Sequence, residues 1–200
     1  MVKDGIPFVL VPLALAALLA YFGLWIIGLF FVFLALFMAF FFRDPHREIP
    51  ADPGLIVSAA DGKVTKVEER GDGKFVSVFL SPFNVHINRS PIAGKVSKVE
   101  LFKGKKAPAT SNEASKTNER NALTIEGEEM TVVCTQIVGI LARRIVCWSK
   151  TGDNLARGER FGLIKFGSRT DLLMPGNVEI QVKVGDRVKG GESIIAKMLE

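Results

Sequence analysis

Apolar positions divide the chain into two parts. Residues 6–42 contain no charged side chain, whereas short apolar runs alternate with polar residues after Arg43. One helix over residues 6–42 would be about 55 Å long, against a bilayer hydrocarbon core of about 30 Å. The pattern therefore predicts a membrane anchor over residues 1–42, formed by a helical hairpin that turns near residues 21–23. A single tilted span with an interfacial extension is the alternative.

Charge suggests which side of the membrane the rest of the chain occupies. Lys3 lies before the apolar segment, and Arg43 and Arg47 follow it, so the positive-inside rule places both ends of a hairpin in the cytoplasm. The net charge of +5 belongs to the remainder, since Lys3 and Asp4 cancel. A basic domain beside a membrane attracts anionic lipid head groups. We therefore expect a cell-membrane protein with a cytoplasmic domain, whose partners are the membrane and an anionic phospholipid rather than nucleic acid.

Residues 43–200 have the pattern of a β domain. Short runs of Val, Ile and Phe are separated by Gly, Asp, Asn and Pro, which predicts a mostly β fold, a compact barrel of short strands. The segment 62–68 is repeated almost unchanged at 94–100, and residues 176–194 resemble the β-hammerheads of biotinyl and lipoyl domains. We expect the glycines of these segments to form turns that close the barrel. Residues 103–121 are polar and are predicted to form a solvated loop.

Few side chains offer redox, metal or imidazole chemistry. Cys134 and Cys147 lie in apolar runs without metal-ligand spacing, so we expect reduced core cysteines and no metal site. Of the two histidines, His46 lies next to the anchor, where a surface role is expected. His86 lies on the polar face of a predicted strand and is the better candidate for chemistry.

A Gly-Ser step follows the strand-like segment 161–166. Glycine leaves the peptide carbonyl of Gly167 uncrowded, so a neighbouring hydroxyl such as that of Ser168 can reach it. Most Gly-Ser steps are ordinary turns, and the step alone does not define a site.

Five separated motifs, taken together, resemble one family. The chain is similar to the short-form phosphatidylserine decarboxylases and their archaetidylserine counterparts, from the anchor exit at residues 41–45 to the C-terminus. The motifs are Ala60-Asp61-Gly62, Ser81-Pro82 with Asn84-Val85-His86, Asn118-Glu119-Arg120-Asn121, Gly158-Glu159-Arg160-Phe161-Gly162 and Phe166-Gly167-Ser168-Arg169.

The resemblance implies a self-processing decarboxylase. Ser168 would attack the carbonyl of Gly167, cut the chain into residues 1–167 and 168–200, and become a covalent pyruvoyl group, so that no separate cofactor is needed. The pyruvoyl carbonyl would accept the electrons released when CO₂ leaves the serine head group of phosphatidylserine or archaetidylserine. The two fragments would stay together as a heterodimer, and a higher homo-oligomer is left open.

The resemblance also implies roles for individual residues. Ser168 needs a base, and the family uses an Asp-His-Ser arrangement, in which Asp61 would orient His86. Longer members carry a second histidine where this chain has Arg89, so either His86 is the base or short forms activate Ser168 differently. The substrate's carboxylate and phosphodiester call for cations. The nearest candidates are Arg143, Arg144, Lys165 and Arg169.

Two other functions fit parts of the sequence. A membrane adaptor with lipoyl-like barrels would explain the anchor and the repeated glycines, but it predicts a long helical hairpin, for which residues 103–121 are too short and polar. A membrane-tethered peptidase would use Lys165 with Ser168. These two residues lie three apart on one strand and so point to opposite faces, which makes that dyad awkward.

Overall fold

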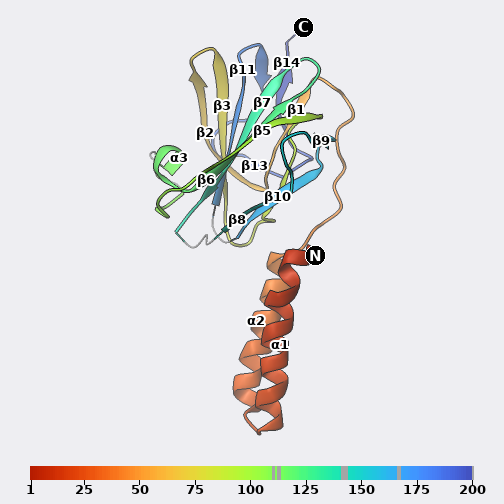
Figure 1. The fold of residues 1–200 in the computed structure, drawn as a ribbon, viewed down its shortest axis with the longest axis vertical. Helices are drawn as coiled ribbons and strands as arrows, with labels where there is room; N and C mark the ends of the chain where they lie inside the picture. The colour runs from red at the N-terminus through yellow and green to blue at the C-terminus, as the bar shows by residue number, and fades with distance from the viewer. Residues whose placement is uncertain (110, 112–113, 141–143, 166–167, 200) are drawn as a thin grey trace. The chain divides into compact units, whose positions relative to one another are not determined.

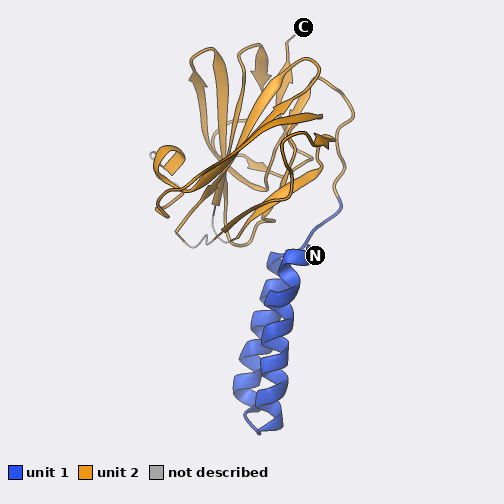
Figure 2. Ribbon diagram, viewed as in Figure 1, with its two compact units in different colours: residues 1–46 blue, residues 47–200 orange. Residues whose placement is uncertain are grey.

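The computed structural model describes residues 1–199 except 110, 112–113, 141–143 and 166–167. The chain divides into two compact units, residues 1–46 and residues 47–200 (Figure 2). The boundary falls after His46, a little beyond the limit of the anchor expected at Phe42.

The first unit consists of apolar helices that pack side by side (Figure 1). A short 3-10 helix, η1 (Lys3–Gly5), precedes α1 (Ile6–Tyr21), and α2 (Trp25–Phe41) follows a turn in which Gly23 has φ of 76°. This turn lies where the sequence analysis places it. The helical stretch Lys3–Tyr21 is long and apolar enough to cross a membrane, and Trp25–Phe41 is apolar but shorter.

The second unit is mostly β, as the alternating pattern predicts. Its sheets have the orders β13-β2-β3-β11-β7-β6-β5-β9, here called the large sheet, β4-β10-β8, the small sheet, and β1-β14-β12. The large sheet curls into a half-barrel (Figure 1), where a compact barrel was expected. The elements are β1 (Leu55–Val57), β2 (Gly62–Arg70), β3 (Gly73–Leu80), β4 (Ile87–Arg89), β5 (Gly94–Phe102), α3 (Ala114–Thr117), β6 (Arg120–Glu126), β7 (Thr131–Val138), β8 (Arg144–Cys147), β9 (Asn154–Leu155), β10 (Arg160–Lys165), β11 (Ser168–Pro175), β12 (Val178–Ile180), β13 (Arg187–Val188) and β14 (Ile194–Met198).

Three central strands of the large sheet have successors or predecessors in the small sheet. β11 pairs with β3 and β7, and β10, which comes just before β11, pairs with β4 and β8. Since β4 follows β3 and β8 follows β7 in the chain, the same three chain segments lie side by side in both sheets. We call the place where they pass from one sheet to the other the sheet junction. Ser168 is the first residue of β11 and therefore lies at the junction.

The repeated segments form equivalent strands. β2 and β5 each begin at a glycine and each show a register shift shortly after their first residues. A Cβ atom at Gly62 would lie 2.1 Å from the Phe79 carbonyl oxygen, and one at Gly94 would lie 2.4 Å from that of Glu126. Both positions therefore require glycine because the neighbouring backbone approaches so closely. The likeness to β-hammerheads stays a prediction.

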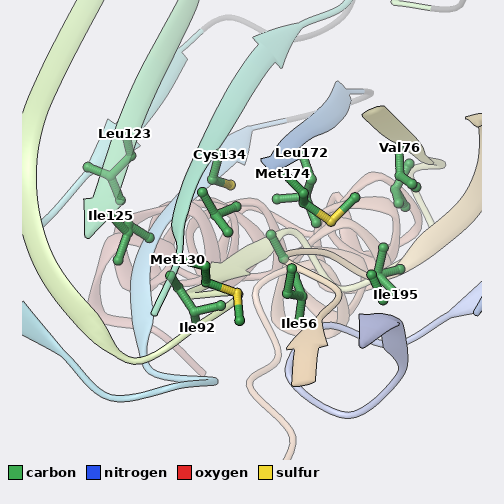
Figure 3. Packing of buried hydrophobic residues seen from close by; sticks show 14 of the residues in the cluster. Ile56, Val76, Ile92, Leu123, Ile125, Met130, Cys134, Leu172, Met174 and Ile195 are labelled. Atoms are coloured by element: carbon green, nitrogen blue, oxygen red, sulfur yellow. The ribbon is translucent and has the colours of Figure 1, made fainter. Parts of the chain in front are cut away.

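The hydrophobic core fills the concave side of the large sheet, away from the junction. Leu123, Cys134 and Leu172, from adjacent strands, are fully buried and lie close together (Figure 3). Burial of one such aliphatic side chain contributes about 1.5–3 kcal/mol. Burial also raises the pKa of the Cys134 thiol, which keeps it protonated. Cys134 and Cys147 are both free, as the sequence predicts.

The described residues of the polar segment between β5 and β6 form more structure than the predicted solvated loop. It contains α3, and Lys105 N donates a hydrogen bond to Thr117 O at 2.8 Å. Asn118 Nδ2 donates to Ala107 O at 2.8 Å and to Val138 O at 2.9 Å, which ties the segment to the end of β7. Buried amide groups of this kind specify a structure that polar composition alone does not reveal.

Candidate active site

Ser168 is completely buried at the sheet junction. Its register partners are Leu80 on β3 and Val138 on β7, so backbone ladders hold it on both sides. Among the described residues, its Oγ has no hydrogen-bond partner. Leaving a buried hydroxyl unsatisfied costs about 1–3 kcal/mol, and such groups often mark reactive positions. Gly167, the other residue of the predicted cut, lies outside the described residues.

His86 immediately precedes β4 on the small-sheet side of the junction. The side chain is 2% exposed, and Nδ1 lies 3.0 Å from Asn84 O. The carbonyl oxygen of His86 accepts a hydrogen bond from Ile164 N at 3.2 Å, so the backbone here continues the pairing of β4 with β10. The imidazole is thus buried within the domain, where a surface histidine would be exposed.

A hydrogen bond between the two sheets relates His86 to Ser168. Asn88 Nδ2 on β4 donates to Thr170 Oγ1 on β11 at 3.1 Å, so the small sheet faces the large sheet at this level. Alternate residues of a strand share a face, so His86 lies on the face of Asn88, and Ser168 lies on the face of Thr170. His86 and Ser168 are each two residues nearer the junction. Both residues are therefore buried at the junction end of their segments.

A buried polar layer separates this pair from the hydrophobic core. Gln136 Nε2 donates to Asn88 Oδ1 at 2.9 Å, and Asn121 Nδ2 donates to Gln136 Oε1 at 3.0 Å. Asn88, Asn121, Gln136 and Thr170 are all at most 2% exposed. A satisfied network of this kind fixes its members in one arrangement. It therefore holds the two sheets at a defined separation beside Ser168.

Asp61 has different partners from those expected. Both of its carboxylate oxygens accept hydrogen bonds from Arg47 Nη2, at 2.9 and 2.8 Å, and Oδ1 also accepts one from Gly190 N at 2.8 Å. Its described partners do not include His86. Sequence reasoning assigned Arg47 to the charge that orients the anchor and missed this ion pair. The available signal was that Arg47 comes a few residues after the apolar segment, within reach of the β domain.

The Arg47–Asp61 pair should stabilise the domain strongly. The Arg47 side chain is 5% exposed and that of Asp61 14% exposed, so Asp61→Asn leaves a buried guanidinium without its main counter-charge. We expect a loss of about 3 kcal/mol in the free energy of unfolding, measured by urea denaturation. Glu68→Gln is the control, since it breaks the exposed Glu68–Arg70 pair and should cost less than about 1 kcal/mol. Equal losses in the two variants would contradict the assignment.

The four residues predicted to bind the substrate's anionic groups do not form one cluster among the described residues. Arg144 on β8 and Lys165 on β10 are direct register partners at the junction end of the small sheet, and Arg144 is exposed. Arg143 lies outside the described residues. Arg169 follows Ser168 on β11, so its side chain points to the opposite face of the strand from that of Ser168. Its position therefore favours a structural role over contact with the substrate.

One cavity of the β domain lies apart from the candidate site. Within the described part of the chain, no three His, Cys, Asp or Glu side chains are grouped so as to hold a metal ion. A cavity of about 700 Å³ is lined by residues that include Ile92, Glu128 and Met130. It lies by the β6–β7 turn, whereas Ser168 pairs with the opposite end of β7. The cavity is therefore separate from the candidate site.

Comparisons with known proteins identify the family. The family model described as phosphatidylserine decarboxylase matches residues 34–196. The chain is 47% identical to the phosphatidylserine decarboxylase proenzyme of Solibacter usitatus, over 100% of this chain and 97% of the relative. The corresponding proenzyme of Symbiobacterium thermophilum is 45% identical, over 98% of this chain and 94% of the relative. The chain is therefore a decarboxylase of phospholipid metabolism. It belongs to the phosphatidylserine decarboxylase family.

Proposed function

We propose that the chain is a precursor that cuts itself between Gly167 and Ser168, and that its new terminus decarboxylates the serine head group of a membrane phospholipid. The observation that carries this proposal is the buried Ser168 hydroxyl, which lacks a described partner and lies on the face of β11 that also carries Thr170, the acceptor of the Asn88 hydrogen bond. The similarity to proenzymes supports processing of the chain.

In the proposed cut, the chain's own groups move the protons. His86 takes the proton of Ser168 Oγ, and that oxygen bonds to the carbonyl carbon of Gly167. The bond from this carbon to the Ser168 nitrogen then breaks, and the proton passes to the nitrogen, so the peptide becomes an ester with a free amine. Loss of the Cα proton of Ser168 expels the Gly167 carboxylate. Water then replaces the nitrogen, which leaves as ammonia.

The surroundings of Ser168 suit the resulting pyruvoyl group. Such a group supplies a carbonyl that accepts the electron pair left when CO₂ departs. Ser168 is fully buried, and the polar layer of Asn88, Gln136 and Thr170 lies on the same face of β11, so water is largely excluded and polar groups are close by. We propose that His86 handles protons here. The role of Asp61 as the orienter of His86 stays a prediction, since the described partners of Asp61 are Arg47 and Gly190.

The residues around the junction suit a lipid. Phe83, between β3 and β4, is 69% exposed, and Ile140, between β7 and β8, is 63% exposed. Exposed apolar side chains in the segments that join the two sheets, together with the exposed Arg144, match a surface that combines acyl or isoprenoid tails with anionic head groups. We propose that Arg144 and Lys165 bind the phosphodiester or carboxylate. Phosphatidylserine and archaetidylserine share this head group, and parallel assays with both lipids distinguish them.

We also propose that the protein lies in the cell membrane. The apolar helices α1 and α2 would form a membrane hairpin, with residues 43–200 on the cytoplasmic side. Single cysteines introduced at the α1–α2 turn or at the C-terminus of the chain, and labelled from outside intact cells, would test this topology. Labelling of the C-terminus from outside the cell would contradict it.

Intact mass spectrometry of the purified full-length chain in detergent tests the function. We expect fragments 1–167 and 168–200, with the smaller fragment about 17 Da lighter than its serine form. The serine side-chain oxygen leaves with the Gly167 carboxylate, one water supplies the new carbonyl oxygen, and the nitrogen leaves as ammonia. Borohydride added with a serine phospholipid should label the terminus of the small fragment covalently. An active preparation that contains only uncut chain would overturn the proposal.

A further inference from the structure

The face of β11 opposite to Ser168 carries a buried ion pair. Arg169 Nε lies 2.9 Å from Asp171 Oδ1, and Arg169 Nη2 donates to Asp171 Oδ2 at 3.0 Å. The side chains are 1% and 5% exposed. Charged groups this deeply buried are retained only when their remaining hydrogen-bonding positions are satisfied.

Further hydrogen-bond partners of this pair come from two distant segments. Ser77 Oγ on β3 donates to Asp171 Oδ1 at 2.6 Å, and Ser115 Oγ on α3 donates to Asp171 Oδ2 at 3.0 Å. Ser115 Oγ also contacts Arg169 Nη2, and Arg169 Nη1 donates to the carbonyl oxygen of Ala109 at 2.9 Å. We call Arg169, Asp171, Ser77 and Ser115 the clamp. It fastens the segment between β5 and β6 to the outer face of β11.

The proposed cut divides the clamp. Arg169 and Asp171 belong to the fragment 168–200, in which Arg169 would be the second residue. Ser77, Ala109 and Ser115 all belong to the fragment 1–167. Every hydrogen bond from the clamp residues of the small fragment to these partners therefore crosses between the two products.

We infer that the clamp is a positioning device that holds the new terminus of the small fragment in the active site after the cut. This inference rests on the proposed function. Before the cut, the chain continues from β10 into β11, so Ser168 is held from both directions. Afterwards its position depends on the ladders to β3 and β7 and on the clamp. Chain termini fray readily unless they are tied down. Arg169 and Asp171 thus position the reacting group from the opposite face without contacting the substrate.

Two conservative variants test the clamp. Ser115→Ala removes the hydroxyl that contacts both charged residues, and Arg169→Lys keeps the charge but loses the planar guanidinium fork. For both we expect self-cleavage within about twofold of the parent rate, then a kcat about tenfold lower in the cleaved enzyme with KM within about twofold. The control is Ser97→Ala on β5, which lies outside the clamp and should match the parent in all three quantities.

Hydrogen exchange separates positioning from general stability. The amides of residues 169–172 should exchange faster in cleaved Ser115→Ala than in the cleaved parent. The same substitution in the uncut Ser168→Ala background should change their exchange little, because the intact chain still holds β11. Equal acceleration in cut and uncut proteins, or a parental kcat in both clamp variants, would overturn the inference. A parent chain that is never cut would instead overturn the proposed function, on which the clamp's role depends.

Discussion

Ser168→Ala should yield an intact, folded chain with no decarboxylase activity. Alanine has no nucleophile to attack the Gly167 carbonyl, so self-cleavage should fall by at least about 1,000-fold. The hydroxyl is completely buried and has no described partner. Its removal should therefore break no hydrogen bond, and it removes a polar group that is buried without a partner. Urea denaturation should therefore show a cooperative transition. Intact mass should show a single species that corresponds to residues 1–200.

The chemical control keeps a nucleophile at the same position. Ser168→Cys places a thiol on β11 and should still cut the chain, through a thioester in place of the ester. The comparison separates loss of the nucleophile from a disturbance of the sheet junction, since both substitutions are small. Cleavage at the same bond in Ser168→Ala would show that another residue attacks, and the assignment of Ser168 would be wrong.

The fold class could be predicted because it depends on local patterns. Alternating apolar residues and turn-forming glycines indicated a β domain, and the repeated segments 62–68 and 94–100 correspond to the equivalent strands β2 and β5. The sheet junction could not be predicted, since it depends on pairings between distant strands. Each strand pattern fits a single sheet equally well, and only the three-dimensional arrangement shows that β10 and β11 belong to different sheets.

The candidate site was predictable in part for a similar reason. Motifs pointed to Ser168 and His86, and both are buried at the junction. The role of Arg169 was harder to predict. The alternation of side chains along a strand shows that Arg169 lies on the face of β11 opposite to Ser168, but it does not show what packs on that face. The segment between β5 and β6, which contacts that face, is polar and has no hydrophobic pattern that would predict its position. Arg47 was hidden in the same way, because its partner Asp61 is brought near it by the tertiary fold.

His86→Gln should slow self-cleavage by about 100- to 10,000-fold, the range typical of removing a general base. Glutamine keeps a polar side chain of similar reach at a position that is 2% exposed, so the domain should still fold, which far-UV circular dichroism would check. The rate is measured from the disappearance of full-length chain after synthesis. His46→Gln is a matched control, because the chain's other histidine lies in the first unit, outside the β domain. It should be cut at the parental rate. A parental rate in His86→Gln would mean that short family members activate Ser168 by another group, with Arg89, at the position of the second histidine of longer members, the first residue to test.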